Sequence, residues 1–326
     1  MRPHVSCGGD ASLRSAAVRP TEAPERWTAV VNPVAGRGRT RRLLPRLRGA
    51  FEKRDVALHV ASSIDDGVLA ARGAFERGNG VIACGGDGTV ALLAGVAAEA
   101  DGTIAVLPTG AGNDFARHLR IDRHPLAALD LLETGRVATV DLARASIEDG
   151  TTAWCTTVAN TGFDADANRW ANGVKVLRGT PLYVAAVLRT AAVFRPQPVI
   201  VRVDDEEWRG RAWLVAVGNT RCYGGGMMIT PAAEVDDGLV DVCVIGPAPV
   251  TKFVGRFPSV FRGTHVRADD VVTFRGRRVE LAPDGGSISL ELWASGDRVG
   301  ALPGSVEVAP GALHVLVPPA APVTRP

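Results

Sequence analysis

The chain has 326 residues, of which 46% are hydrophobic and 22% charged, and its net charge is +2 at pH 7. This length allows two domains with sizeable cores, and the near-zero charge gives no reason to expect a nucleic-acid partner. No apolar run reaches the roughly 18 residues of a membrane-spanning helix, and the five cysteines form no Cys-x-x-Cys pair, which is typical of a reducing, cytoplasmic location.

The first part of the chain alternates strand-like and helix-like stretches. Short apolar runs predict strands at 28–33, 56–62, 80–86 and 102–108. Apolar residues at helical spacing predict helices over 40–54, over 66–78 and directly after residue 89. Strands that alternate with helices predict a parallel sheet with right-handed crossovers, hence an α/β domain.

After about residue 140, strand-like runs dominate. They cover 138–145, 154–163, 199–204, 211–219, 238–246, 272–282, 289–294 and 312–318. Several alternate polar and apolar residues, which predicts antiparallel sheets with one covered face. The stretch 181–194 predicts a long helix, which we expect to cover the core; contact with a membrane is the alternative. The polar, proline-containing ends, 1–26 and 319–326, are expected to be disordered tails.

Three glycine-rich loops follow strands of the predicted parallel sheet, at 32–38, 85–89 and 108–117. Because the carboxyl ends of parallel strands meet at one edge of a sheet, we expect these loops to share one crevice. Glycine between a strand and a helix lets a phosphate group approach free main-chain N–H groups. The carboxylate of Asp87 within such a loop favours a bound Mg²⁺ ion or a ribose contact. For any single loop, ordinary Gly-Asp turn chemistry is the alternative.

Five stretches of the chain, in this order and spacing, resemble the bacterial diacylglycerol kinase type of lipid kinase, a family that also includes sphingosine and ceramide kinases. They are NPVAGRGR, GGDGTV, LPTGAGNDFAR, NTGFDADAN and GNTRCYGGGMMITPAAEVDDGLVDV. The resemblance implies an ATP-binding domain over 27–139, similar to phosphofructokinase and NAD kinase, and a β-sandwich lipid-substrate domain over 140–311. It also implies that the last strand, 312–318, returns to the first domain.

The resemblance carries roles for individual residues. Those implied to bind ATP are Asn32, Gly36, Ser63, Gly86, Asp87, Gly88, Thr89, Gly110 and Asn113. Lipid-binding roles are implied for Asp114 and Asp164, and the implied Mg²⁺ ligands are Glu234, Asp237 and Leu239. Simpler interpretations stay open: a helix cap for Asn113, a surface turn for Asp164 and a hairpin turn at Asp237.

The chain departs from the family at the position of the catalytic residues. The family usually has Asp-Gly-Glu there, whereas this chain has Ser295, Gly296 and Asp297. Phosphoryl transfer depends mainly on positioning and charge neutralisation, so Asp297 alone is predicted to serve as the catalytic base, although it is one methylene shorter than Glu. Polar positions of the family are also replaced by Ala91, Leu92 and Ala111.

Together these features predict an ATP- and Mg²⁺-dependent lipid kinase that phosphorylates a lipid hydroxyl, by default that of diacylglycerol, which gives phosphatidic acid. Such an enzyme is expected to be cytoplasmic and to associate peripherally with the membrane that holds its lipid; a homodimer is left open. One alternative is a non-catalytic homologue that binds nucleotide or lipid after losing the Asp-Gly-Glu motif. Another is an enzyme similar to NAD kinase, which shares the Gly-Gly-Asp-Gly loop.

Overall fold

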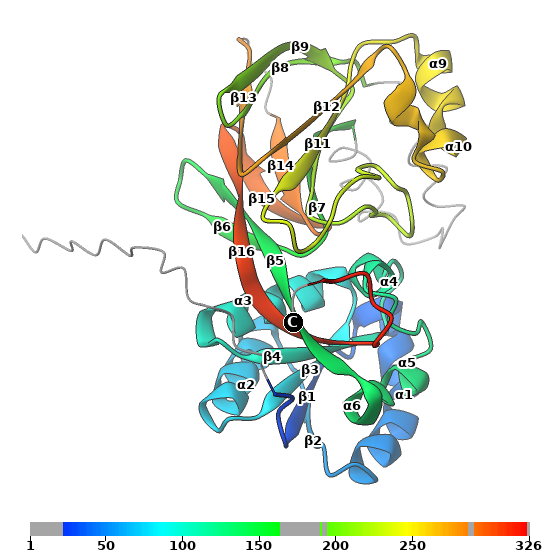
Figure 1. The fold of residues 1–326 in the computed structure, drawn as a ribbon, viewed down its shortest axis with the longest axis vertical. Coiled ribbons are helices and arrows are strands. Elements are labelled where there is room, and N and C mark those ends of the chain that lie inside the picture. Colours follow the sequence, from blue (N-terminus) through cyan, green and yellow to red (C-terminus); the bar gives the residue numbers. More distant parts are fainter. Residues whose placement is uncertain (1–21, 164–189, 191–193, 286–289, 325–326) are drawn as a thin grey trace, which may run out of the picture.

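The computed structural model describes residues 22–163, 190, 194–285 and 290–324 of the chain. In this part of the chain, a ten-stranded mixed sheet and a six-stranded antiparallel sheet build two domains (Figure 1). The predicted fold class, an α/β domain followed by an antiparallel β domain, is confirmed. Asp164 and nearly all of the helix predicted at 181–194 lie outside the described residues.

The first domain contains four adjacent parallel strands, in the order β2 (Ala57–Val60), β1 (Trp27–Val31), β3 (Gly80–Gly85) and β4 (Thr103–Pro108). The connecting helices are α1 (Ala35–Glu52), α2 (Ile64–Glu76) and α3 (Asp87–Ala100). Helices α2 and α3 lie together on one side of the sheet, and α1 lies on the other (Figure 1). Strands β1, β3 and β4 are buried along their whole length, as their continuous apolar sequences require.

Two long strands, β5 (Arg136–Ile147) and β16 (Gly304–Val317), run through both domains (Figure 1). The end of β16 pairs in parallel with β4, with His314 opposite Thr103. The beginning of β16 pairs with β13 (Arg278–Pro283) of the second domain, and β5 pairs with β16 along nearly its whole length. The short helices α4 (Asp114–His118), α5 (Pro125–Ala128) and α6 (Leu131–Thr134) lie between β4 and β5 in the chain. Because one continuous sheet joins the domains, the loops at its edge face the second domain.

The second domain packs the six-stranded sheet against the extension of the ten-stranded one. The order of the six strands is β12 (Val271–Gly276), β11 (Val240–Ile245), β10 (Leu214–Gly218), β7 (Val158–Gly162), β14 (Glu291–Ala294) and β15 (Asp297–Ala301). The extension consists of β13 with β8 (Gln197–Val203), β9 (Glu206–Ala212) and β6 (Thr152–Cys155). Alternate residues of both sheets, such as Val201, Val215 and Val242, form the shared apolar core.

Three predicted strands are wrong in one respect, because each divides into two strands that belong to different sheets. The stretch 154–163 becomes β6 and β7, 211–219 becomes β9 and β10, and 272–282 becomes β12 and β13. The chain passes from one sheet to the other within one or two residues, at Trp213 for example. Apolar spacing reports that a residue is covered but not which sheet it belongs to.

The outer face of the six-stranded sheet is covered by a segment that the sequence did not predict as helical. It contains α9 (Val250–Gly255), α10 (Phe257–Val260) and the 3₁₀ helix η1 (Thr264–Arg267). Phe253 of α9 stacks on Trp213 with ring centroids 4.4 Å apart, and both belong to a separate apolar cluster. Within the described residues no helix is both long and apolar enough to cross a bilayer.

Candidate active site

The three glycine-rich loops touch one another at the carboxyl end of the parallel strands. The first and second loops are joined by a hydrogen bond in which Asn32 Nδ2 donates to Thr89 Oγ1 at 2.9 Å. The first and third loops touch at Gly36, where an added Cβ would lie 2.5 Å from the carbonyl oxygen of Thr109. Gly36 also has φ of +58°, so close approach and backbone conformation both require glycine. The structure therefore brings the three loops into one crevice.

The second and third loops pack main chain against main chain. An added Cβ on Gly110 would collide with the Cα of Gly86, and one on Gly86 would lie 3.3 Å from the Cα of Gly110. Gly86 directly precedes α3, whose first amides have no acceptor within the helix. The helix dipole and these free N–H groups make the start of α3 a site for an anion such as a phosphate group.

Asp87, the first residue of α3, fixes the relative position of the second and third loops. Its Oδ1 accepts hydrogen bonds from the backbone N–H groups of Asp114 at 2.7 Å and Phe115 at 3.2 Å. Burial, and then the nearby carboxylate of Asp114, raise the pKa of Asp87 to about 6 despite these bonds. A carboxylate in such a position favours a cation or a hydroxyl donor in the crevice.

Asn113 stands at the N-cap position of α4, but its side chain does not cap the helix. Instead, Oδ1 accepts from the N–H of Gly110 at 2.9 Å, and Nδ2 donates to the carbonyl of Gly110 at 3.0 Å. Asn113 has φ of +53°, a conformation that Asn tolerates better than most residues. The side chain thus holds the third loop in shape, which the simple cap interpretation does not describe.

Ser63 is a helix cap in this structure. Its side chain accepts a hydrogen bond from the N–H of Asp66 at 3.1 Å at the start of α2. The carboxylate of Asp66 in turn binds the amide and hydroxyl of Ser62, at 2.7 and 2.9 Å, and lies 3.0 Å from His59. Ser63 follows β2, the strand next to β1, and none of these hydrogen bonds joins it to the glycine-rich loops.

Asp114 links the first domain to the second. Its side chain is buried, and its Oδ2 accepts a hydrogen bond from the N–H of Gly225 at 2.7 Å, in the turn between β10 and β11. Arg117 Nε lies 3.5 Å from Oδ1, yet burial still raises the pKa of the Asp114 carboxyl. Oδ1 is buried and accepts no hydrogen bond from the described residues, so Arg117 is its nearest charged neighbour.

Asp297 approaches the phosphate-binding loop from the second domain. It is the first residue of β15, and its Oδ2 lies where a side chain on Gly88 would stand, 2.5 Å from an added Cβ. The side chain remains accessible, but the surrounding protein displaces enough water to raise the pKa of its carboxyl. The predicted catalytic residue and the predicted phosphate loop therefore face each other across the domain boundary.

Ser295, which stands where the family has its first carboxylate, forms the turn that positions Asp297. Ser295 and Gly296 have φ of +48° and +91° between β14 and β15, as expected in a two-residue type I′ hairpin turn, and Ala294 pairs with Asp297. Ser295 is 7% exposed, and its Oγ accepts a hydrogen bond from the N–H of Thr156 at 3.2 Å. The first carboxylate of the motif thus corresponds to a buried turn residue here, not to a group in the crevice.

The predicted Mg²⁺ ligands lie in the loop before β11. Asp237 Oδ1 accepts from the N–H of Leu239 at 3.0 Å, and its Oδ2 pairs with Arg275, which also lies 3.3 Å from Asp241. No group of three or more His, Cys, Asp and Glu side chains in the described ranges has the arrangement of a metal site. Burial raises the pKa of Asp241 to about 6, and Asp237 and Glu234 add to the rise while Arg275 opposes it. The guanidinium of Arg275 thus pairs with both Asp237 and Asp241, so it occupies the position in which a cation would neutralise these carboxylates.

Sequence reasoning missed Asp141 of β5. This buried carboxylate accepts hydrogen bonds from the N–H groups of Gly238 at 2.6 Å and Gly311 at 2.7 Å. It thereby fixes the acidic loop of the second domain to both long strands. A lone Asp inside an apolar strand sequence was the signal, because a buried carboxylate needs partners.

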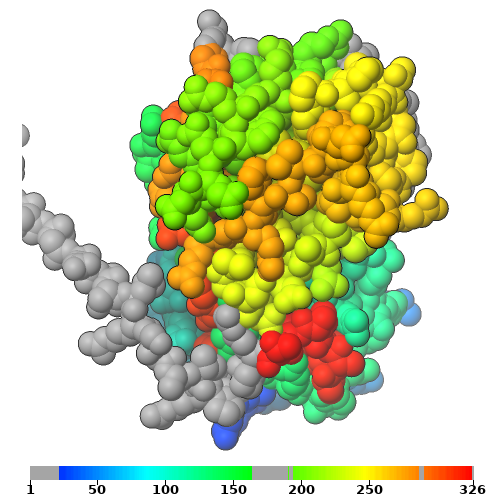
Figure 2. Space-filling view, turned by 45° about the horizontal axis from the view of Figure 1, so that its top comes forward, coloured from blue at the N-terminus to red at the C-terminus, as the bar shows by residue number. Residues whose placement is uncertain are grey.

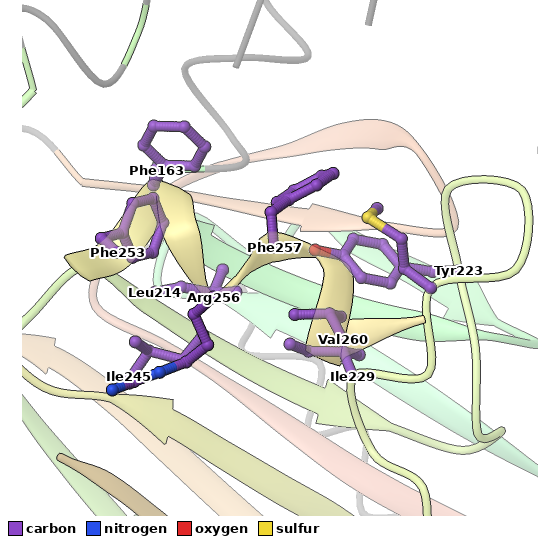
Figure 3. Close-up of a pocket in the computed structure, with 10 residues that line it drawn as sticks. Phe163, Leu214, Tyr223, Ile229, Ile245, Phe253, Arg256, Phe257 and Val260 are labelled. Atoms are coloured by element: carbon purple, nitrogen blue, oxygen red, sulfur yellow. The ribbon is translucent and has the colours of Figure 1, made fainter. Parts of the chain in front are cut away.

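An apolar pocket lies in the second domain, between the six-stranded sheet and α9–α10 (Figure 3). Its enclosed space is about 30 Å³, room for roughly two water molecules. Phe253 and Phe257 come from the two helices, and Tyr223 comes from the turn that also holds Gly225. The lining residues are Phe163, Leu214, Tyr223, Met227, Ile229, Ile245, Phe253, Arg256, Phe257 and Val260.

A glycine-rich crevice suited to phosphate, opposed by a carboxylate from a β domain, is the arrangement of a two-domain phosphotransferase. The comparisons then identify the family. Residues 26–145 match the model described as diacylglycerol kinase catalytic domain, and residues 157–317 match that of the YegS C-terminal NAD kinase beta sandwich-like domain. The chain belongs to the diacylglycerol kinase family of lipid kinases, and this family membership implies ATP as the phosphate donor.

Individual relatives agree with this assignment. The chain is 34% identical over 296 residues to a diacylglycerol kinase of Mycobacterium tuberculosis. The aligned region covers 89% of this chain and 94% of the relative. It is 30% identical over 290 residues to a YegS-like lipid kinase of Stenotrophomonas maltophilia, over 85% of this chain and 88% of the relative. A crystal structure of a diacylglycerol kinase from Bacillus anthracis shares the fold, with a TM-score of 0.66, 21% identity, and coverage of 91% and 98% of the two chains.

Proposed function

We propose that this lipid kinase transfers the γ-phosphate of ATP to the free hydroxyl of diacylglycerol and so makes phosphatidic acid. The observation that carries the proposal is the position of Asp297 Oδ2 beside Gly88 of the phosphate loop. Support for a lipid acceptor comes from the family, whose members are lipid kinases. The identity of the relatives supports diacylglycerol as the first acceptor to test.

The proposed reaction uses the geometry of the crevice. Main-chain amides at the start of α3 bind the phosphate groups, and the contacts of Asn32, Gly86 and Gly110 keep the loops at the right separation. Asp297 accepts the proton of the lipid hydroxyl as the oxygen attacks the γ-phosphorus, and ADP leaves. The raised pKa of Asp297 brings its carboxyl closer to the pKa at which proton transfer is efficient near neutral pH.

Other residues are proposed to orient the two substrates. Asp114, whose carboxylate joins the third loop to the turn that holds Gly225, is proposed to help orient the lipid headgroup. Asp164, which follows β7, is proposed to contact the lipid headgroup, and Ser63 is proposed to contact the nucleotide while it caps α2. Binding of both substrates would then fix the reacting oxygen and phosphorus atoms in line.

Mg²⁺ is proposed as the cofactor, and when bound with ATP it neutralises charge on the phosphate groups. A second ion is proposed at the acidic loop, held by the Asp237 carboxylate and the carbonyl groups of Glu234 and Leu239. The enzyme is proposed to work in the cytoplasm and to associate peripherally with a membrane, because its substrate is a membrane lipid. The domain division near residue 140 is proposed to separate the nucleotide and lipid sites.

The test is transfer of labelled phosphate from ATP to a panel of acceptors: diacylglycerol, ceramide, sphingosine and NAD. We expect label in phosphatidic acid with wild type and a loss of about 10²–10⁴-fold in the Asp297→Asn variant, the range of general base catalysis. Label in ceramide or sphingosine alone would show that the enzyme is a lipid kinase with a different acceptor. Label in NAD alone would refute the proposal of a lipid kinase. If wild type binds ATP and labels no acceptor, the protein is a nucleotide-binding homologue without activity.

A further inference from the structure

The segment 250–267, which we name the α9–α10 segment, combines an aromatic series with positive charge. Its phenylalanines, Phe253, Phe257 and Phe261, are spaced four residues apart. Phe253 is buried in the apolar cluster and lines the pocket, Phe257 lines the pocket at partial exposure, and Phe261 is 48% exposed. The rings of Phe257 and Phe261 are in edge contact with centroids 5.8 Å apart. Figure 3 shows Phe253 and Phe257 at the pocket, and the contact of Phe257 with the exposed Phe261 extends this aromatic series to the surface.

The charge of this segment has one sign. Residues 250–267 contain Lys252, Arg256, Arg262 and Arg267 and no Asp or Glu. Asp270, just beyond the segment, pairs with Arg256 at 2.6 Å and with Lys252 at 3.2 Å. Arg262 and Arg267 are exposed and make no ion pair with the described residues. The exposed end of the segment therefore carries two arginines and an exposed aromatic ring, and the exposed Asp269 follows just beyond it.

The surroundings favour a bilayer over a soluble partner. The segment forms part of the surface of the second domain, where it is yellow to orange in Figure 2. One face of the six-stranded sheet packs against the core between the two sheets, and the α9–α10 segment covers the opposite face. The segment therefore lies over the pocket and not between the domains. A lipid substrate has its headgroup at the membrane surface and its chains beneath it. An exposed aromatic ring flanked by arginines matches that order, with the ring among the chains and the cations at anionic headgroups.

We propose that the α9–α10 segment is the surface by which this enzyme docks on an anionic membrane, with Phe261 entering the bilayer interface and Arg262 and Arg267 facing acidic headgroups. This assignment rests on the proposed function, because it presumes a lipid substrate in a membrane. Each arginine at such a surface contributes about a fivefold gain in partitioning, and half-burial of a phenylalanine about tenfold. The pocket behind the ring then lies next to the acyl chains of the docked bilayer.

The test is flotation of the full-length protein with vesicles, without ATP, so that binding is measured apart from catalysis. One set of vesicles is phosphatidylcholine alone, and the other contains about one third phosphatidylglycerol. We expect preference for the anionic vesicles, a tenfold loss in Phe261→Ser and a loss of about 25-fold in the double variant Arg262→Ser with Arg267→Ser. Thermal unfolding of each variant checks that the fold is intact.

Matched controls come from the first domain. Leu69→Ser removes a side chain that is 69% exposed on α2, and Arg46→Ser with Arg48→Ser removes two exposed arginines of α1. We expect both controls to float like wild type. If they lose binding while Phe261→Ser does not, another face contacts the membrane and the proposal is wrong.

The outcome separates docking from the proposed reaction. Wild type that labels diacylglycerol, with all variants floating equally, would overturn the docking surface and leave the reaction in place. Wild type that floats through Phe261 yet labels no acceptor would support the surface and refute the reaction. If Phe261→Ser instead converts a dimer to a monomer by light scattering and floats unchanged, the surface binds a second copy, which also overturns the proposal.

Discussion

Replacing Gly110 with alanine tests whether contact between two glycine-rich loops creates the nucleotide site. The new Cβ would overlap the Cα of Gly86 and lie 2.8 Å from Asn113 Oδ1, so main chain must move. An ordinary carbon contact requires the loops to separate by on the order of 1 Å. Overpacking of this kind costs about 1–3 kcal/mol. The same displacement weakens hydrogen bonds from the amides of α3 to a charged phosphate, each of which contributes about 1.5–3 kcal/mol.

The expected result is a loss of about 2 kcal/mol in ATP binding, or roughly thirtyfold in Kd. Isothermal titration with a non-hydrolysable ATP analogue measures it. The matched control is Gly49→Ala in α1, where an added Cβ meets no atom within 4 Å and the backbone is helical. That control should bind the analogue as wild type does and gain about 0.5–1 kcal/mol of stability. A folded Gly110→Ala variant with unchanged Kd would refute the role of the loop contact.

Three further predictions concern charge and buried hydrogen bonds. Because folding raises the pKa of Asp87 to about 6, the folded protein binds this proton more tightly than the unfolded chain, and the free energy of unfolding falls as pH rises from about 4 to 6. In urea unfolding, Asp87→Asn should therefore be about 1–2 kcal/mol more stable than wild type at about pH 8 but not at pH 4. An equal difference at both pH values would contradict this. Ser295→Ala should lower the free energy of unfolding by about 1–2 kcal/mol, because the buried N–H of Thr156 loses its acceptor; unchanged stability would show that water replaces the hydroxyl. In Arg275→Ala the carboxylate of Asp237 loses its guanidinium partner, so added Mg²⁺ should raise the melting temperature of this variant more than that of wild type, both measured without nucleotide. An equal rise in both proteins would argue against an ion at that loop.

The order of elements in the first domain could be predicted from sequence because local and global signals agree there. Apolar runs of β1, β3 and β4 are buried on both faces, and each is followed by glycine and a helix. The meeting of the three loops follows from parallel topology alone. The contact of Gly36 with Thr109 adds a detail that only coordinates supply, because the positive φ at residues 36–38 bends the start of α1 toward the third loop.

The second domain was less predictable, for two physical reasons. Strands such as β9 and β10 follow one another almost without a break, so the change of sheet at Trp213 leaves no turn residue in the sequence. The helices α9 and α10 have six and four residues, with Gly255 at the end of one and Pro258 in the first turn of the other. Helices this short do not show helical spacing in the sequence. The packing of the α9–α10 segment against the sheet, as in the stacking of Phe253 on Trp213, determines its conformation.

The role of the replaced motif residue also required coordinates. From sequence, Ser295 is a lost carboxylate next to Asp297. In the structure it is a turn residue with φ of +48° whose hydroxyl binds the main chain of Thr156. Turn geometry therefore explains why the hairpin that presents Asp297 forms without the first acid of the motif.

The most direct test of the central claim is the single-turnover rate of phosphate transfer to diacylglycerol by Asp297→Asn with ATP already bound. Asparagine keeps the size of the side chain beside Gly88 but cannot accept the proton of the hydroxyl. We expect a rate lower by about 10²–10⁴-fold with the Kd for ATP unchanged. A rate within about twofold of wild type would contradict this expectation, because Asp297 would then not be the base that accepts the proton of the lipid hydroxyl beside the phosphate loop.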